Sequence, residues 1–293
     1  QSIHAGLLPD DAYQPEMPAD VLEARTGIPA IDLAVRALYE TGYVHNHARM
    51  WLASYLVHLR KVHWHAGGQW LLGHLLAGAV ASTHLSWQWV AGTSSTKPYL
   101  FNADNVAKYA PAQWHSTGTV IDTSYEEMDR IARSATPIRP YRGRSLEGMQ
   151  TPNVSNTPPP GTWSAPDSGI VTGHDVWLVH PWSLGAPPQK FQTDGLVIGV
   201  GFAQAHAAQP WSAQRWRFVA QGLQAHSAHL WWGDAEQIAR ALGTARSVSW
   251  QPDAHPHAAL PDLQKQSPPP LFETVQGYCP SFAQWWRKTK IAE

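Results

Sequence analysis

Apolar positions in the first third of the chain recur with the 3.6-residue period of amphipathic helices. The pattern predicts four helices, over residues 29–40, 45–62, 69–79 and 80–90. Pro29 suits the first turn of the first helix, and Gly42 ends it. Gly67-Gly68 predicts a break before the third helix. Residues 1–24 are polar and contain proline, so we expect an irregular arm that either packs on some other surface or is disordered.

A short helix and a proline-rich stretch follow. Ser124 predicts the start of a helix that ends near Arg133, with Glu127 closing a capping box. Residues 135–168 are rich in Pro, Asn, Ser, Thr and Gly, which is typical of a linker or an extended strap.

Beyond residue 173, short apolar runs of the buried-strand type alternate with helical patterns. The runs cover residues 175–184, 195–202, 229–232 and 247–250, and the helical patterns cover 212–225 and 234–242. This alternation predicts a small parallel sheet with right-handed crossovers. The tail from Pro268 to Pro270 predicts a strap, and residues 281–286 a helix that docks.

The patterns together predict a fold of class α plus α/β. Three parts are expected: a helical domain over residues 1–134, whose first 24 residues form the arm, a proline-rich linker over 135–173, and a small α/β domain with a C-terminal strap and helix over 174–293.

Composition narrows the class of protein. The chain has 293 residues, is 43% hydrophobic and 15% charged, and has a net charge of −1, so no overall basic field attracts nucleic acid. A single cysteine, Cys279, excludes a disulfide framework within one chain. The longest apolar run, from Trp70 to Ala81, is too short to span a bilayer, and no signal peptide is recognised. A cytoplasmic protein without membrane contact is the expectation.

Small residues lie beside aromatic residues between positions 77 and 89. The stretch from Ala77 to Ser82 would let backbone or a flat ligand approach closely, and Trp87 and Trp89 follow it. A binding site for a planar ligand is one interpretation. Ordinary helical core is the other, and composition alone favours it.

Three sequence blocks in this region carry a family resemblance. Thr26–Asp32, Thr41–Met50 and Trp87–Trp89 resemble, in order and spacing, the second half of the FAD-binding helical domain of the photolyase/cryptochrome flavoproteins. The resemblance covers about residues 25–110. Residues 174–251 are similar, more weakly, to the α/β domain of that family, in reversed order. A circular permutation and an independent fusion both remain open.

The resemblance implies a cofactor, FAD, and roles for individual residues. Residues that match flavin-contacting positions of the family are Asn46, Arg49, Thr83, His84 and Trp87. Trp87 and Trp64 match the first two members of the tryptophan chain that reduces the flavin. Met50 and Trp89 match residues that face a damaged pyrimidine pair. Packing is the competing interpretation for each tryptophan, because the chain has 16 of them.

The chain also departs from the family pattern. Two acidic positions of the family are Ala77 and Ala79 here, so Arg49 lacks the carboxylate that it would pair with. Another acid or an anionic ligand is expected to replace it, or else Arg49 is exposed. The third tryptophan position falls near Asp11, where there is no Trp. The first half of the helical domain, with its catalytic glutamate, has no counterpart.

The histidines provide no recognisable metal-binding motif. The pairs His63/His65, His226/His229 and His255/His257 form neither an H-E-x-x-H motif nor a Cys/His framework. No metal site is therefore predicted.

Two hypotheses follow for the function. The first is a photolyase/cryptochrome-like flavoprotein of reduced size, with light-linked electron transfer through Trp87 and Trp64, DNA as a candidate partner and, if active, photolyase-like lyase chemistry. The alternative is a non-catalytic binding or partner module with weak or lost FAD binding. A half-pocket would expose apolar surface, and the helices of the α/β part are needed by its own sheet. A homodimer or a partner protein that completes the pocket is therefore favoured over closure by the chain itself.

Overall fold

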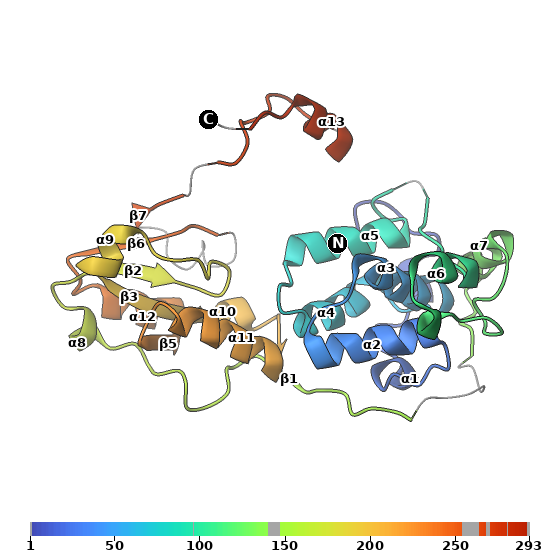
Figure 1. The fold of residues 1–293 in the computed structure, drawn as a ribbon, viewed down its shortest axis with the longest axis horizontal. Coiled ribbons are helices and arrows are strands. Elements are labelled where there is room, and N and C mark those ends of the chain that lie inside the picture. Colours follow the sequence, from blue (N-terminus) through green and yellow to red (C-terminus); the bar gives the residue numbers. More distant parts are fainter. Residues whose placement is uncertain are drawn as a thin grey trace. The chain divides into compact units, whose positions relative to one another are not determined.

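A computed structural model describes residues 2–95, 97–139, 147–253, 264–267, 270–279 and 281–291 (Figure 1). The chain forms two compact units. One comprises Gln1–Thr162 with His206–Gln221, and the other comprises Trp163–Ala205 with Gly222–Glu293. The division into domains at residues 134 and 174 stays a prediction. His255, His257 and Pro268-Pro269, which figured in the sequence interpretation, lie outside the described residues.

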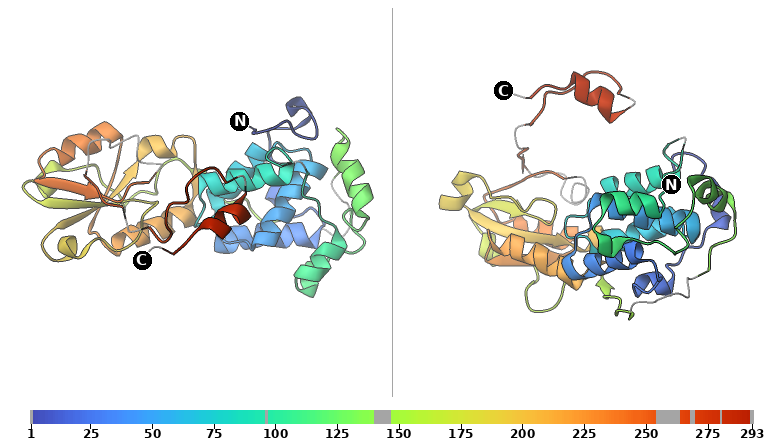
Figure 2. Two further views of the ribbon diagram at one scale, coloured as in Figure 1. Left: turned by 90° about the horizontal axis from the view of Figure 1, so that it is seen from above. Right: turned by 45° about the vertical axis from the view of Figure 1, so that its right-hand side comes forward.

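The first unit is helical (Figures 1 and 2). Its α-helices are α1 (Ala19–Leu22), α2 (Pro29–Thr41), α3 (Asn46–Ser54), α4 (Trp64–His74), α5 (Val80–Ala91), α6 (Ala103–Tyr109), α7 (Tyr125–Arg133) and α11 (Ala213–Gln224), the last of which runs on into the second unit. Short 3-10 turns lie at Asp10–Ala12 and Ala112–Trp114, and a π-helical turn at Tyr55–Leu59. The core gathers buried aliphatic and aromatic side chains from α2, α3, α4 and α5, among them Val35, Leu52 and Trp87.

Several predicted elements of this unit are confirmed. Pro29 opens α2, and Gly42 ends it with a left-handed backbone at φ 66°. Helix α5 begins at Val80, as predicted. The Ser124 side chain accepts a hydrogen bond from the Glu127 amide and so caps α7.

The predicted break at Gly67-Gly68 is wrong. Both glycines lie inside α4, which spans Trp64–His74 instead of residues 69–79. The predicted helix over residues 45–62 is also interrupted, because α3 passes at Tyr55 into the π-helical turn. Glycines that usually punctuate a helix are retained here for close packing against another helix, as described below.

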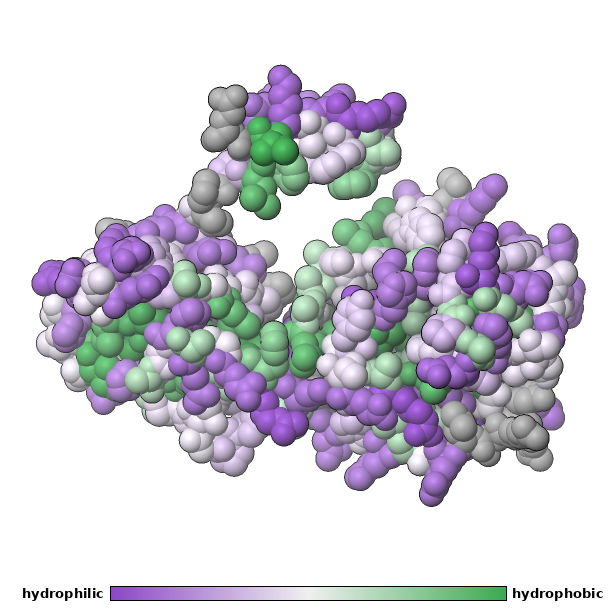
Figure 3. Space-filling model, viewed as in Figure 1, coloured by the Kyte–Doolittle hydropathy of each residue, from purple (hydrophilic) through white to green (hydrophobic). Residues whose placement is uncertain are grey.

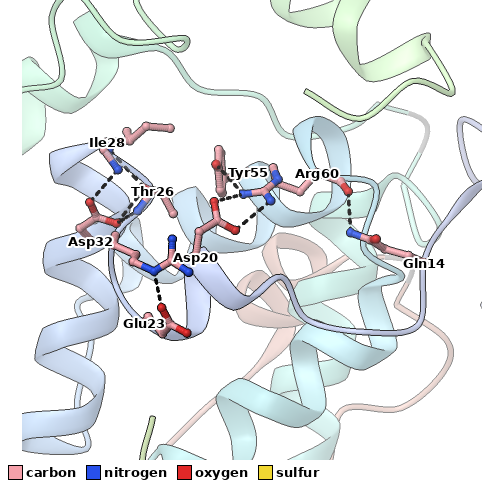
Figure 4. Close-up of polar contacts among 10 residues, drawn as sticks. Gln14, Asp20, Glu23, Thr26, Ile28, Asp32, Tyr55 and Arg60 are labelled. Atoms are coloured by element: carbon pink, nitrogen blue, oxygen red, sulfur yellow. Dashed lines mark hydrogen bonds and ion pairs between the residues drawn. The ribbon is translucent and has the colours of Figure 1, made fainter. Parts of the chain in front are cut away.

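The N-terminal arm packs on the helices. Asp20 accepts hydrogen bonds from both terminal nitrogens of Arg60, at 2.7 and 2.9 Å, and both side chains are buried (Figure 4). Arg60 also donates to the Tyr55 hydroxyl at 3.1 Å. Nearby, the Asp32 carboxylate accepts from the amides of Thr26 and Gly27, which fixes the turn that precedes α2. Part of the Thr26–Asp32 sequence block thus has a structural role.

The second unit contains the predicted parallel sheet. Its strands are β2 (Asp175–Val179), β3 (Leu196–Phe202), β5 (His229–Gly233), β6 (Ser247–Trp250) and β7 (Gln264–Lys265), in the order β5-β3-β2-β6-β7, and all paired neighbours are parallel. Leu178 of β2 pairs with Ile198 on one side and Trp250 on the other. The accompanying helices are α8 (Ser168–Val171), α9 (Gln189–Thr193), α10 (Ala203–His206), α12 (Ala235–Leu242) and α13 (Phe282–Lys288). A complete capping box between Asp234 and Gln237 opens α12.

One expectation about the α/β part is wrong, because part of it serves the helical unit. Strand β1 (Val154–Ser155) pairs antiparallel with β4 (Trp211–Ser212), and residues His206–Gln221 belong to the helical unit. The Arg215 guanidinium, at the start of α11, donates to the backbone oxygens of Leu72 and Gly78. This segment therefore covers the C-terminal end of α4.

The C-terminal segment carries exposed apolar side chains beside charged ones (Figure 3). Phe272 bridges to Ile291, and the Phe272 ring packs edge-on against Trp285 and Trp286. Tyr278 and Phe282 are largely exposed.

Candidate functional site

Helices α3 and α5 run side by side in the same direction. At one end the Leu76 amide donates to the Gly42 oxygen at 3.0 Å, just before both helices begin. At the other end, His58 Nε2 lies 2.9 Å from the Val90 oxygen. The first turns of the two helices therefore lie at the same end of the pair, and these turns carry Asn46 and Thr83.

The first turns of α3 present polar groups at this end. Asn46 is exposed, and its Nδ2 lies 3.8 Å from the sulfur of Met50. Arg49 is half-buried; its Nε donates to the Val44 oxygen at 2.7 Å, and its guanidinium lies 5.6 Å from the ring centroid of Tyr43. Within the described residues Arg49 has no ion pair. The Val44 oxygen and the face of the Tyr43 ring thus contact Arg49 where the family resemblance would place a carboxylate.

Trp87 lies against the glycine pair of α4. It is 2% exposed. A Cβ atom on Gly67 would lie 2.5 Å from Cη2 of Trp87, and one on Gly68 would lie 3.5 Å from its Cγ. The absence of side chains at these two positions lets the indole approach the α4 backbone, which carries Trp64 at its start.

His84 forms a cluster of three rings with Trp64 and His65. Its ring centroid is 5.7 Å from that of Trp64 and 5.2 Å from that of His65. Burial, together with the nearby His65, lowers the pKa of His84, so the ring is neutral at neutral pH. The Nε2 atom of His84 is shielded from water and has no hydrogen-bond partner among the described residues.

Trp89 lies apart from this cluster on the outer face of α5. It is 45% exposed, and its ring lies 5.6 Å from that of Tyr99. The two rings border an open groove of about 440 Å³ that Lys97 and Tyr125 also line. The groove offers aromatic faces and one cation.

Comparison with known proteins identifies the helical unit. A protein-family model described as the FAD binding domain of DNA photolyase matches residues 13–136. The match supports a relationship between this part of the chain and the photolyase/cryptochrome family. FAD, the cofactor expected from the sequence, is the cofactor that this domain family binds.

Curated photolyases are also similar to part of this chain. The deoxyribodipyrimidine photo-lyase of Streptomyces griseus is 46% identical over 74 residues, which is 25% of this chain and 16% of the relative. The Synechococcus enzyme is 35% identical over 124 residues, or 40% of this chain and 25% of the relative. The Escherichia coli enzyme is 39% identical over 83 residues, covering 27% and 18%. The chain thus spans a quarter or less of the length of these photolyases.

Two solved photolyases are also similar. The archaeal photolyase from Sulfolobus tokodaii is 29% identical with a TM-score of 0.31, over 38% of this chain and 27% of that chain. A class III photolyase from Agrobacterium tumefaciens is 22% identical with a TM-score of 0.33, over 43% and 36%.

The groups at the photolyase-like site are compatible with a flavin nucleotide. FAD combines flat apolar ring faces with carbonyl edges and anionic phosphates. The unpartnered His84 Nε2 could hydrogen-bond to a ring edge, and the terminal nitrogens of Arg49 suit an anion or a carbonyl. Ala79 and Ala81 are exposed and small, so a flat ring could approach α5 closely.

The sequence interpretation missed two residues near these sites. Tyr99 lies against Trp89. In the sequence it directly follows Lys97-Pro98, a pattern that indicates the end of a loop and does not indicate a contact with Trp89. Tyr13 lies against His63, the residue before Trp64, and comes two positions after Asp11, where a third tryptophan had been sought.

In the part of the chain that the structure describes, no group of three or more His, Cys, Asp or Glu side chains could hold a metal ion. None of the described helices combines the length and the apolar character that crossing a bilayer requires.

Proposed function

We propose that the chain is a photolyase-like flavoprotein in which FAD lies along the first turns of α3 and α5. In this proposal Asn46 and Arg49 approach it from α3, and Thr83, His84 and Trp87 from α5. The observation that carries it is the buried contact of Trp87 with Gly67 and Gly68 of α4, the helix that begins at Trp64, within the stretch that matches the photolyase domain. Bound FAD would supply a light-absorbing electron acceptor.

Trp87 and Trp64 would deliver electrons to the excited flavin. Both indoles are buried, at 2% and 5% exposed, and both are held by packing on or within α4. Rigid, water-poor surroundings favour electron transfer because little has to reorganise when charge moves. Met50 and Trp89 would contact a nucleic-acid substrate, with Trp89 offering an exposed ring for stacking.

Absorption spectroscopy tests the cofactor site. The protein should bind one FAD per chain on titration, and Arg49→Ala should weaken binding about tenfold, as expected for losing one charge-assisted hydrogen bond. Lys108→Ala, an exposed cation on α6, is the matched control and should bind FAD as the unmodified chain does. Failure of the unmodified chain to bind FAD would refute the proposal.

Blue-light photoreduction tests the electron path. In the presence of a thiol, Trp87→Phe should slow flavin photoreduction strongly, because phenylalanine is much harder to oxidise. Trp89→Phe should leave the rate unchanged, since that ring lies on the other side of α5 from the proposed path. Equal rates in the unmodified chain and Trp87→Phe would remove Trp87 from the electron path. No photoreduction in the unmodified chain would support the alternative, a non-catalytic binding or partner module with weak or lost FAD binding.

Ala77 and Ala79 are exposed and stand where the family has two acids. The absence of these acids favours the non-catalytic alternative over DNA repair. Titration with an oligonucleotide that contains a pyrimidine dimer, with an undamaged one as control, separates the two. Preferential binding that is lost in Trp89→Ala supports a DNA-directed role.

A homodimer or a partner protein on the α5 face stays part of the proposal. Leu85 and Trp89 on that face are about half exposed. Light scattering at tens of micromolar protein should show a mass of two chains if the protein is a homodimer. The mass of a single chain would contradict the homodimer.

A further inference from the structure

A tryptophan radical formed at Trp64 would be isolated from bulk solvent. Trp64 is 5% exposed, and its Nε1 donates to the Ser2 hydroxyl at 2.9 Å. A thiol or another dissolved reductant therefore cannot reach the ring directly. If electrons pass through Trp64, a further donor must connect it with the surface.

The N-terminal arm brings a phenol to this place. Gln14 pairs with Val62 in an isolated parallel bridge, in which the Gln14 amide donates to the Lys61 oxygen at 2.7 Å and the His63 amide donates to the Gln14 oxygen at 2.9 Å. These bonds fix the adjacent Tyr13.

The ring contacts lead from Tyr13 to Trp64. The ring of Tyr13 lies 6.3 Å from that of His63, edge to face, and the His63 ring lies 5.6 Å from that of Trp64. Tyr13, His63, Trp64 and Asp10 line one small cavity of about 10 Å³. A space of this size holds at most about one water molecule, so protein atoms fill the region between the phenol and the indole.

We infer that Tyr13 is the terminal electron donor of this chain, reducing oxidised Trp64 where a third tryptophan is missing. The inference rests on the proposed electron path through Trp87 and Trp64. His63 separates the two rings, but imidazole is harder to oxidise than phenol, so it serves as the medium between them. The arm sequence around Asp11 contains no tryptophan, and Tyr13 is the oxidisable ring that the arm itself places beside the cavity.

The transfer balances as a coupled loss of one electron and one proton. Burial raises the pKa of Tyr13, so the phenol is protonated when it reacts. One electron passes from Tyr13 to the oxidised Trp64, which returns to its neutral form. The O–H bond of Tyr13 breaks at the same time, and its proton passes to the carboxylate of Asp10, which lines the same cavity and is exposed to water. A neutral tyrosyl radical remains, and a dissolved thiol restores the phenol by giving it a hydrogen atom.

Electron paramagnetic resonance of the FAD-loaded chain under blue light tests the assignment. With ring-deuterated tyrosine, the protein radical should show the altered hyperfine pattern of a tyrosyl radical. Tyr13→Phe should abolish that signal, and Tyr13→Trp should replace it with a tryptophanyl signal. Tyr109→Phe, which removes a hydroxyl from an exposed tyrosine on α6, should leave it unchanged.

A second experiment does not depend on FAD. A ruthenium photosensitiser attached to Ser82→Cys, in a Cys279→Ser background, would oxidise tryptophan from the exposed side of α5 when an external electron acceptor is supplied. The radical should again reach Tyr13, and Trp64→Phe should stop it. A tyrosyl signal that survives Tyr13→Phe would overturn the inference. So would a radical that stays on tryptophan in the chain that keeps Tyr13. Success here without FAD binding would refute the proposed function and leave the donor role intact.

Discussion

The indole of Trp87 lies directly against the backbone of Gly67. A Cβ atom at position 67 would lie 2.5 Å from Cη2 of Trp87 and closer still to Cζ3, whereas at Gly68 the nearest indole atom would be 3.5 Å away. Because Trp87 is 2% exposed, its ring cannot move aside without opening the core. Two adjacent glycines therefore differ in what they tolerate, and the difference is set by one aromatic ring.

Gly67→Ala should destabilise the helical unit, and Gly68→Ala should not. The added methyl group at position 67 forces Trp87 out of its packing, at a cost of about 1–3 kcal/mol that exceeds the gain in helix propensity. At position 68 the same gain, about 1 kcal/mol, is unopposed. Urea denaturation followed by tryptophan fluorescence measures both. Equal shifts in the two variants would show that Trp87 does not constrain position 67.

Asp20→Ala should be the more damaging of two changes in the N-terminal arm. Removing this carboxylate leaves the guanidinium of Arg60 buried without its partner, which typically costs about 3–5 kcal/mol. The matched control is Glu23→Ala, since Glu23 pairs with Arg25 at the surface (Figure 4). That exposed pair should contribute nothing measurable. A denaturation midpoint that falls equally in both variants would contradict the assignment.

The alternation of apolar runs and helices was enough to predict much of the second unit. The strand over Ser247–Trp250 was predicted residue for residue, and β3 and β5 to within one residue, because short runs rich in β-branched and aromatic residues between helical patterns leave few alternatives. Their parallel pairing followed from the helices between them.

The errors in the first unit arose where tertiary packing overrode a local rule. Gly67-Gly68 looks like a break because glycine weakens helices, yet its partner Trp87 is 20 residues away in sequence and could not be paired with it in advance. Likewise, nothing in the sequence around Arg215 indicates that it holds the end of α4. Residue identities at the candidate site were accessible through family resemblance, whereas the burial of Trp64 and the placing of Tyr13 required the structure.

Acidification should destabilise the helical unit through two buried histidines. Burial lowers the pKa of His58 and of His74 from 6.5 to about 4 in the folded chain. Below about pH 6.5 these residues gain protons only on unfolding, so stability is present above that pH and falls as the pH drops toward 4.

The free energy of unfolding should fall by at most about 3 kcal/mol through His58, which is fully buried and hydrogen-bonded to the Val90 oxygen. Denaturation at pH 7 and pH 5 should therefore differ less in His58→Gln than in the unmodified chain. His4→Gln, at an exposed position, should keep the full difference. A pH dependence that is unaltered in His58→Gln would assign the effect to other groups.

Arg215→Lys should loosen the loop between α4 and α5, although the charge is kept. The buried guanidinium reaches the Leu72 oxygen with one terminal nitrogen and the Gly78 oxygen, at 2.8 Å, with the other, and it lies 4.1 Å from the ring centroid of Trp211. Its pKa falls to about 10 through burial, which shows how poorly water reaches it.

A lysine ammonium cannot span both carbonyls or stack on the indole, so we expect a loss of about 1.5–3 kcal/mol. Arg217→Lys, two residues along α11 and exposed, is the matched control and should behave as the unmodified chain. The readouts are the denaturation midpoint and protection of the Leu75–Ala79 amides from hydrogen exchange. Because two carbonyls of the α4 end depend on Arg215, faster exchange should be confined to that loop in Arg215→Lys. Equal exchange rates of the Leu75–Ala79 amides in Arg215→Lys and Arg217→Lys would mean that packing alone holds the C-terminal end of α4.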